Sequence, residues 1–151
     1  MTKYRILPSG FRDVKFGKNV KVVEPCNLYG CVLGDYVFVG PFVEIQSDVF
    51  IGKSTKIQSH SFICSLVTIG DCCFIGHGVM FVNDTFSSGG PANGDETLWK
   101  KTSIGNNVSI GSNATILPVT ICSDVVIGAG AVVTKDILES GRYAGNPAKR
   151  L

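Results

Sequence analysis

The sequence has little charge and no long apolar run. Charged residues are 17% of the 151 residues and hydrophobic residues are 44%, so the chain is too apolar for an intrinsically disordered protein. Its most uniformly apolar stretch, residues 125–133, is interrupted by glycine and is much shorter than the roughly 18 residues that a membrane-spanning helix needs. The net charge of +2 does not indicate nucleic-acid binding. We expect one folded domain, residues 1–151, that neither crosses a membrane nor binds nucleic acid.

Signals for secretion, disulfides and bound metal are also missing. The first ten residues lack the apolar core of a secretory signal. Of the six cysteines, Cys72 and Cys73 are adjacent, which is a poor arrangement for a bridge, and no paired cysteines have the spacing of a zinc site. We therefore expect a cytoplasmic protein without a metal cofactor, whose free cysteines serve as small interior residues.

The main positive feature is an internal repeat with a period of six residues. Successive blocks between residues 51 and 80 read IGKSTK, IQSHSF, ICSLVT, IGDCCF and IGHGVM. Extended in both directions, this frame gives eighteen blocks. Their first residue is always apolar, their second is glycine in nine blocks, and their fifth is small or β-branched. Two blocks, residues 28–32 and 116–120, have five residues instead of six.

A six-residue period fits neither an α-helix nor a plain alternating strand, but it fits a triangular β-solenoid. Each block then forms one short strand and one corner, and its first and fifth residues share the interior of the prism. Glycine at the second position is expected to relieve backbone strain at the corner. Three blocks complete a coil, so the sequence predicts an all-β, parallel β-helix of about six triangular coils, roughly 30 Å tall at ~4.8 Å per coil.

Three segments fall outside the frame. Residues 1–15 precede the first block and are expected to form an N-terminal cap, and residues 138–151 follow the last block as a C-terminal arm. Residues 85–101 interrupt the frame as an inserted loop that is rich in glycine, serine and asparagine and contains Trp99 and Lys100. Loops that leave a regular scaffold are where binding groups concentrate.

The hexapeptide blocks resemble those of the left-handed β-helix acyltransferases over about residues 14–151. Within that family, the segments IQSHSFICS, GHGVMFVND, SIGSNATILPVTI, VIGAGAVVTKDI and AGNPAKRL resemble the sugar-nucleotide N-acetyltransferases. The resemblance implies a left-handed β-helix that transfers acetyl from acetyl-CoA to the 3-amino group of a UDP- or dTDP-linked amino sugar, for polysaccharide biosynthesis. It also implies a homotrimer with active sites in the grooves between neighbouring prisms, which suits a flat-faced prism without a deep pocket of its own.

One stretch departs from this subgroup. After Asn83 and Asp84 the subgroup often has a basic–aromatic–Pro–Arg stretch, whereas this chain continues with TFS. An arginine for the phosphates is therefore missing from its expected place. Lys100 or Lys101 in the inserted loop is the candidate replacement.

Histidine chemistry is limited to His60 and His77. Their blocks begin 18 residues apart, at Ile57 and Ile75, so both side chains are expected near one corner of adjacent coils. They are either exposed corner residues, or a general base and a ligand orienter near the acceptor amine. The GHGV segment of the resemblance favours His77 as the catalytic histidine and leaves His60 as a substrate-binding candidate.

Asn83 and Asp84 come directly before the inserted loop. They are either a turn pair that begins the loop, or an amide that orients the acceptor amine and a carboxylate that places the sugar or the loop. A sugar amine is partly neutral near pH 7–8, so orientation can supply much of the rate. Asn83 is therefore the preferred catalytic residue, with His77 as the alternative or additional base. Trp99 either stacks on a nucleobase or anchors the loop, and Lys100 is a candidate phosphate contact.

The blocks after the loop are the expected acetyl-CoA half of the site. Gly111, Ser112 and Ala129 present small side chains at corners, where a pantetheine arm can lie along the prism; ordinary corner geometry is the alternative explanation. Three basic residues are candidate contacts for the phosphates of CoA, with a solvated basic tail as the alternative. These residues are Lys135, Lys149 and Arg150.

Other functions are weighed against this one. A hexapeptide-repeat acetyltransferase for another small acceptor, such as a xenobiotic, serine or a non-nucleotide sugar, fits the same repeat. A zinc enzyme of the carbonic anhydrase type requires three histidine ligands, and this chain has two histidines. An ice-binding prism requires a repeated outward threonine array, whereas the outward residues here include Lys53, Gln58 and Asp71.

Overall fold

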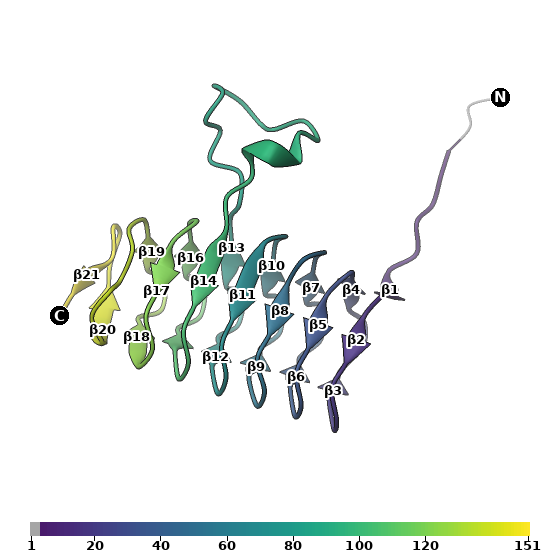
Figure 1. Ribbon diagram of the computed structural model, residues 1–151, viewed down its shortest axis with the longest axis horizontal. Coiled ribbons are helices and arrows are strands. Elements are labelled where there is room, and N and C mark those ends of the chain that lie inside the picture. The colour runs from purple at the N-terminus through teal and green to yellow at the C-terminus, as the bar shows by residue number, and fades with distance from the viewer. Residues whose placement is uncertain (1–3) are drawn as a thin grey trace.

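The computed structural model describes residues 4–151. From Gly10 onward the chain winds into a triangular prism with three sheets, and the described segment before it extends away from the prism (Figure 1). Sheet A contains β1 (Gly10–Arg12), β4 (Asn27–Tyr29), β7 (Glu44–Ile45), β10 (Phe62–Ile63), β13 (Met80–Phe81), β16 (Thr115–Ile116) and β19 (Val132–Val133). Sheet B contains β2 (Lys15–Phe16), β5 (Val32–Leu33), β8 (Phe50–Ile51), β11 (Val67–Ile69), β14 (Thr102–Ile104) and β17 (Thr120–Ile121). Sheet C contains β3 (Lys21–Val22), β6 (Phe38–Val39), β9 (Lys56–Ile57), β12 (Phe74–Ile75), β15 (Ser109–Ile110), β18 (Val125–Ile127), β20 (Gly141–Ala144) and β21 (Lys149–Arg150).

The hexapeptide frame predicted these strands. Each of the eighteen first positions lies in one of the strands β2 to β19, from Phe16 to Val133. Strands that are one coil apart pair in parallel and in register, so that Ile45 of β7 lies beside Ile63 of β10. The all-β, left-handed β-helix is confirmed.

The prism is longer than the six coils predicted from the repeat. Sheet A has seven strands and sheet C has eight, because strands also form near both ends of the chain. β1 pairs with β4 at the N-terminal end, and β20 pairs with β18 at the C-terminal end. β21 then turns back and pairs with β20 antiparallel. Within residues 4–151, no helix has the length and hydrophobicity of a membrane span.

First-position side chains form the core of the prism, as predicted, except at its N-terminal end, where Phe16 is exposed and Val22 is half-buried. Six consecutive isoleucines are fully buried: Ile45, Ile51, Ile57, Ile63, Ile69 and Ile75. The prediction for the fifth positions was wrong where the repeat is irregular. In the two five-residue blocks the fourth residue fills the interior, namely Cys31 and Val119, because the turn is one residue shorter. In the interrupted block, Thr102 pairs beside Val67 and takes the interior place expected for Thr85.

Glycine at the second position has a different role from the one predicted. Gly40 and Gly105 do not have a positive φ, so they relieve no left-handed strain. Instead, a Cβ on Gly40 would lie 2.8 Å from the amide nitrogen of Ser59, and one on Gly105 would lie 2.6 Å from that of Ser123. The left-handed residue is the fourth of a block, as at His60 with a φ of 64°. These glycines therefore allow adjacent coils to stack closely.

All six cysteines are free thiols. Burial raises the pKa of Cys31 to about 11 and that of Cys64 to about 12, so both thiols are neutral near pH 7. The interior location predicted for all six was wrong for Cys72, which is exposed, because its left-handed corner position turns it outward. Cys122 is half-buried, and the buried thiols are Cys26, Cys31, Cys64 and Cys73. Among residues 4–151, no three His, Cys, Asp or Glu side chains form a group suited to a metal ion.

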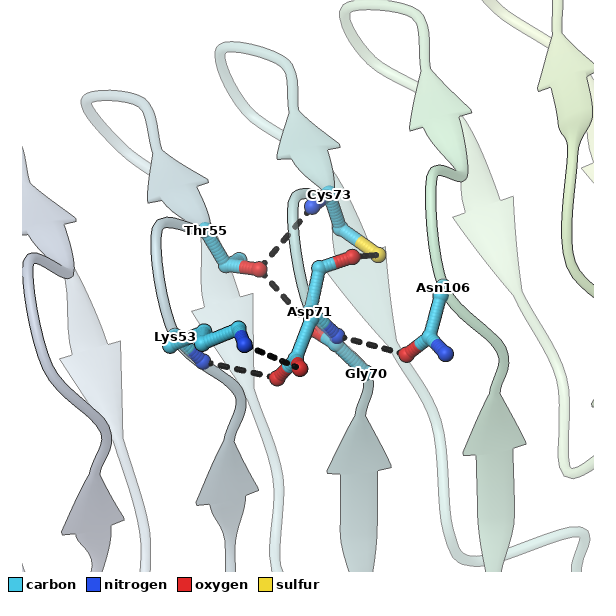
Figure 2. A network of polar contacts seen from close by, with 6 residues as sticks. All are labelled: Lys53, Thr55, Gly70, Asp71, Cys73 and Asn106. Atoms are coloured by element: carbon cyan, nitrogen blue, oxygen red, sulfur yellow. Dashed lines mark hydrogen bonds and ion pairs between the residues drawn. The ribbon is translucent and has the colours of Figure 1, made fainter.

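Side chains and backbone amides are linked from coil to coil at the corner between sheets B and C (Figure 2). The amide of Lys53 donates to Asp71 Oδ1 at 2.9 Å, and the amide of Asp71 donates to Asn106 Oδ1 at 2.8 Å. Beneath them, the fully buried hydroxyl of Thr55 donates to the carbonyl of Gly70 at 2.8 Å and accepts from the amide of Cys73 at 2.9 Å. Corner groups that lie outside the sheets are thereby satisfied.

Replacing Thr55 with valine is expected to lower the free energy of unfolding by about 1–3 kcal/mol. The change keeps the shape of the side chain but leaves a buried carbonyl and a buried amide without their partner. Urea unfolding followed by circular dichroism measures this loss. Thr68→Val, at an exposed position of β11, is the matched control and should change the free energy of unfolding by less than about 0.5 kcal/mol. Equal effects at the two positions would contradict the role assigned to Thr55.

Candidate functional site

Both histidines lie at the corner between sheets C and A, which we call the His77 corner. It consists of residues 41–42, 59–60, 77–78, 112–113 and 129–130 in successive coils. Backbone hydrogen bonds connect these coils: the amide of Gly78 donates to the carbonyl of Ser59 at 3.0 Å, and that of Asn113 to the carbonyl of His77 at 2.9 Å. His77, Ser112 and Ala129 therefore form one column along the edge of the prism, in line with Ser59, and His60 lies beside this column in line with Gly78.

The backbone at His77 is held firmly. The buried hydroxyl of Ser61 donates to the carbonyl of Gly76 at 2.8 Å, one residue before His77. The His77 side chain is itself exposed, so it extends into solvent from a fixed corner. One coil earlier, the ring of His60 packs on Phe42 with 4.9 Å between ring centroids. Sequence analysis missed Ser61 and Phe42, although Ser61 occupies a fifth position and its hydroxyl was a visible signal.

The residues expected to bind acetyl-CoA continue the same column beyond His77. Gly111 has no room for a side chain, since a Cβ there would lie 2.8 Å from Cα of Ala129. Ser112 is half-buried and Ala129 is exposed, and nothing lies within 4 Å of the place where a Cβ on Gly130 would be. The corner beyond His77 is thus an open strip of small side chains.

Asn83 and Asp84 lie at a different corner, between sheets A and B, where the chain leaves the prism after β13. The Asn83 amide nitrogen donates to the carbonyl of Ser65 at 3.2 Å. The Asp84 carboxylate accepts the amide of Phe86 at 2.9 Å and that of Ala92 at 2.7 Å. Asp84 therefore holds the inserted loop, which is one of the two roles considered for it from the sequence.

The inserted loop projects away from the prism between β13 and β14 (Figure 1). It contains one short 3-10 helix, η1 (Glu96–Leu98), whose N-cap Asp95 accepts the amide of Thr97. Trp99 follows η1 and is half-buried, whereas Lys100 is exposed. The amide of Lys100 donates to the carbonyl of Asn83 at 2.9 Å, which closes the base of the loop.

The three basic residues expected to contact CoA are not brought together. Lys135 is exposed beyond β19, at the corner between sheets A and B. Lys149 and Arg150 lie in β21, at the end of sheet C. The Arg150 guanidinium already contacts Glu139 Oε2 at 2.6 Å and the carbonyl of Ser140 at 3.1 Å. Lys149 is exposed and stays a candidate for a phosphate contact.

His77 and Asn83 lie at the two corners of the prism that flank sheet A, since His77 precedes β13 and Asn83 follows it. The strand β13 and the width of sheet A lie between them, because the two residues belong to different corners of the prism. One copy of the chain therefore does not place both side chains around a single amine. A site that uses both residues requires the His77 corner of one copy to face the Asn83 corner of another.

Comparisons with known proteins agree with this architecture. A family model described as the hexapeptide repeat of succinyl-transferase matches residues 101–135. The UDP-3-O-acylglucosamine N-acyltransferase of Campylobacter curvus (strain 525.92) is 33% identical over 137 residues, which are 90% of this chain and 38% of that protein. The chain thus spans well under half the length of this curated relative.

Two solved structures are similar to the prism. A hexapeptide-repeat-containing acetyltransferase of Vibrio cholerae O1 biovar eltor, complexed with acetyl coenzyme A, has a TM-score of 0.67 and 26% identity over 81% of this chain and 69% of that one. A mutant of perosamine N-acetyltransferase from Caulobacter crescentus, in complex with CoA and GDP-perosamine, has a TM-score of 0.68 and 24% identity over 91% of this chain and 57% of that one.

Proposed function

This chain belongs to the hexapeptide-repeat family, and from that premise we propose that it transfers acetyl from acetyl-CoA to the amino group of a nucleotide-linked amino sugar. The observation that carries the proposal is the His77 corner, where an exposed histidine on a rigid backbone lies beside an open strip of small side chains. Two relatives support the two halves of the reaction. The V. cholerae protein is complexed with acetyl coenzyme A, and the C. curvus protein is named for a UDP-linked acylglucosamine.

The proposed chemistry is a single acyl transfer. The neutral sugar amine forms a bond to the carbonyl carbon of the thioester, and the carbon–sulfur bond then breaks. His77 accepts the proton that the amine loses, and the departing CoA thiolate is protonated to the free thiol. The oxygen of the Asn83 side chain accepts an N–H of the amine and orients its lone pair, because the nitrogen of that amide already donates to Ser65.

The active unit proposed is a homotrimer. In a closed ring of three copies, the His77 corner of each prism faces the Asn83 corner of the next, which brings the two residues into one groove. Apolar side chains suited to such a contact flank His77: Phe74 is 40% exposed on β12 and Met80 is 42% exposed on β13. The inserted loop of the neighbouring copy covers the groove.

Light scattering is expected to give about three times the 16.1 kDa mass of one chain. Burial of the apolar residues beside His77 is the reason for association. Replacing Met80 with glutamate should shift the particle mass toward the monomer, whereas Lys53→Glu, on a distant corner, should not. A wild-type mass near 16.1 kDa would contradict the shared site.

Transfer of labelled acetyl across a panel of acceptors tests the function itself. The panel contains UDP-, dTDP- and GDP-linked amino sugars, the corresponding free amino sugars, serine and a set of xenobiotic acceptors. We expect label in a nucleotide-linked amino sugar together with stoichiometric release of CoA thiol. If label appears only in a free sugar, serine or a xenobiotic, the protein is still an acetyltransferase, but the proposed substrate class is wrong.

A further inference from the structure

A hollow lies on sheet C at the N-terminal end of the prism, over β3, β6 and β9, which are side by side in Figure 1. Its volume is about 720 Å³, within the range of small-molecule sites. Its lining contains two cationic, two aromatic and two amide side chains. They are Lys21, Lys56, Tyr36, Phe38, Asn19 and Gln58.

The strand register fixes the order of charge and aromatic surface in this hollow. Lys21 of β3 pairs with Phe38 of β6, and Phe38 pairs with Lys56 of β9. Because neighbouring strands are about 4.8 Å apart, the two lysines lie on the order of 10 Å apart with the Phe38 ring between them. Tyr36, at the adjoining corner, is 59% exposed and adds a second ring at the rim.

The positive charge of the hollow is not compensated locally. Its lining contains no carboxylate. Within residues 4–151, the two ion pairs join Lys53 to Asp71 and Arg150 to Glu139, so neither Lys21 nor Lys56 is neutralised by one. Two ammonium groups without an ion-pair partner lie beside one exposed ring, Tyr36, and one half-buried ring, Phe38, which provides what an anion with a planar aromatic group requires.

We propose that this hollow binds a nucleoside diphosphate, with the base against Tyr36 and Phe38 and the phosphates between Lys21 and Lys56. Asn19 and Gln58 supply amide donors and acceptors for the edge of the base or the ribose. The proposal that the hollow binds a nucleoside diphosphate is argued from its lining residues alone. The identification of the ligand as the nucleotide part of the acceptor rests on the proposed function.

The position of the hollow relative to the His77 corner supports that identification. Gln58 lies two residues before His60, at the edge where sheet C meets the corner, and His77 follows in the next coil. His60 follows Lys56 by four residues, through the end of β9 and the corner turn, which corresponds to about 13 Å at most. A sugar attached beyond the second phosphate therefore points along β9 toward the two histidines.

Isothermal titration of the wild-type protein with UDP, dTDP, GDP and CoA tests the inference without catalysis. We expect one of the three nucleoside diphosphates to bind, and Lys21→Ala, Lys56→Ala and Tyr36→Ala each to raise its Kd about tenfold or more. Lys15→Ala is the matched control, because Lys15 lies in the same coil on sheet B and is also exposed. Its Kd should stay within about twofold of the wild-type value.

Three outcomes would overturn the inference: no binding of any of the three diphosphates at millimolar concentration, an equal effect of Lys15→Ala, or a loss confined to CoA. The last would assign the hollow to the adenosine diphosphate part of the cosubstrate, which shares the same chemistry. Failure of the proposed function has a different signature. In that case the diphosphate still binds and the lysine variants still weaken it, but no acetyl reaches a nucleotide-linked sugar.

Discussion

Replacing His77 with alanine is expected to lower kcat/KM for acetyl transfer by about 10²- to 10⁴-fold, the usual contribution of a general base. Asn83→Ala is expected to lose turnover of the amino sugar while it still binds CoA, because Asn83 is remote from the strip of small side chains along the His77 corner. Steady-state kinetics and CoA titration measure the two effects. His77 is exposed, so His77→Ala should keep the wild-type melting temperature, whereas Asn83→Ala loses the hydrogen bond to the Ser65 carbonyl and should lower the melting temperature modestly.

Mixing the two inactive proteins should restore activity. If each site takes His77 from one copy and Asn83 from its neighbour, each trimer that contains both variants has one of its three sites with both native residues. Co-expression with two different affinity tags, followed by sequential purification of mixed trimers, gives the material for the assay. The double variant His77→Ala/Asn83→Ala, mixed with either single variant, is the control and should stay inactive.

Two results would contradict this mechanism. If both single variants are inactive and their mixed trimers are inactive too, the two residues act in the site of one copy. That result would contradict their placement at different corners of the prism. A near wild-type rate for Asn83→Ala, together with an inactive His77→Ala protein, would leave the histidine as base without an orienting amide. Both readouts are independent of which nucleotide the acceptor carries.

Replacing residues 86–99 with a short Gly-Ser linker is expected to raise KM for the sugar nucleotide about tenfold or more and to leave the melting temperature nearly unchanged. In the described structure, every hydrogen bond that a backbone amide of residues 86–99 donates has its acceptor within residues 84–99. The linker therefore removes none of the hydrogen bonds between coils. A surface loop of different length costs little in folding free energy. The acceptor loses the cover of the loop and with it Trp99, whose ring is suited to add to the base contacts proposed for Tyr36 and Phe38.

Kinetics with both substrates and differential scanning calorimetry test the loop replacement. KM for acetyl-CoA should rise less than threefold or so, since a pantetheine arm on the small-residue strip lies along a different corner. Trp99→Ala in the intact loop separates stacking from simple enclosure, because only a stacking role makes it reproduce much of the KM effect. A linker variant that fails to fold, or one that folds and keeps its KM, would show that the loop is structural or incidental.

The sequence by itself determined the architecture of this protein. Every coil needs three inward apolar residues, and the chain supplies one every five or six residues from Phe16 to Val133, with one insertion. Few folds other than a triangular β-solenoid fit such a period, so the strands, the three faces and the place of the inserted loop could be predicted from the sequence. The shared corner of His60 and His77 followed from the same arithmetic, because their blocks begin 18 residues apart.

Only the tertiary structure decided which side chains meet between coils. The Ser61 hydroxyl reaches the backbone before His77, the Phe42 ring packs on His60, and Gly40 leaves room for the coil beside it. These contacts join residues 15 to 19 positions apart, and their partners depend on how one coil sits on the next. The repeat fixes the period of the prism, whereas the stacking of its coils decides which functional groups become neighbours.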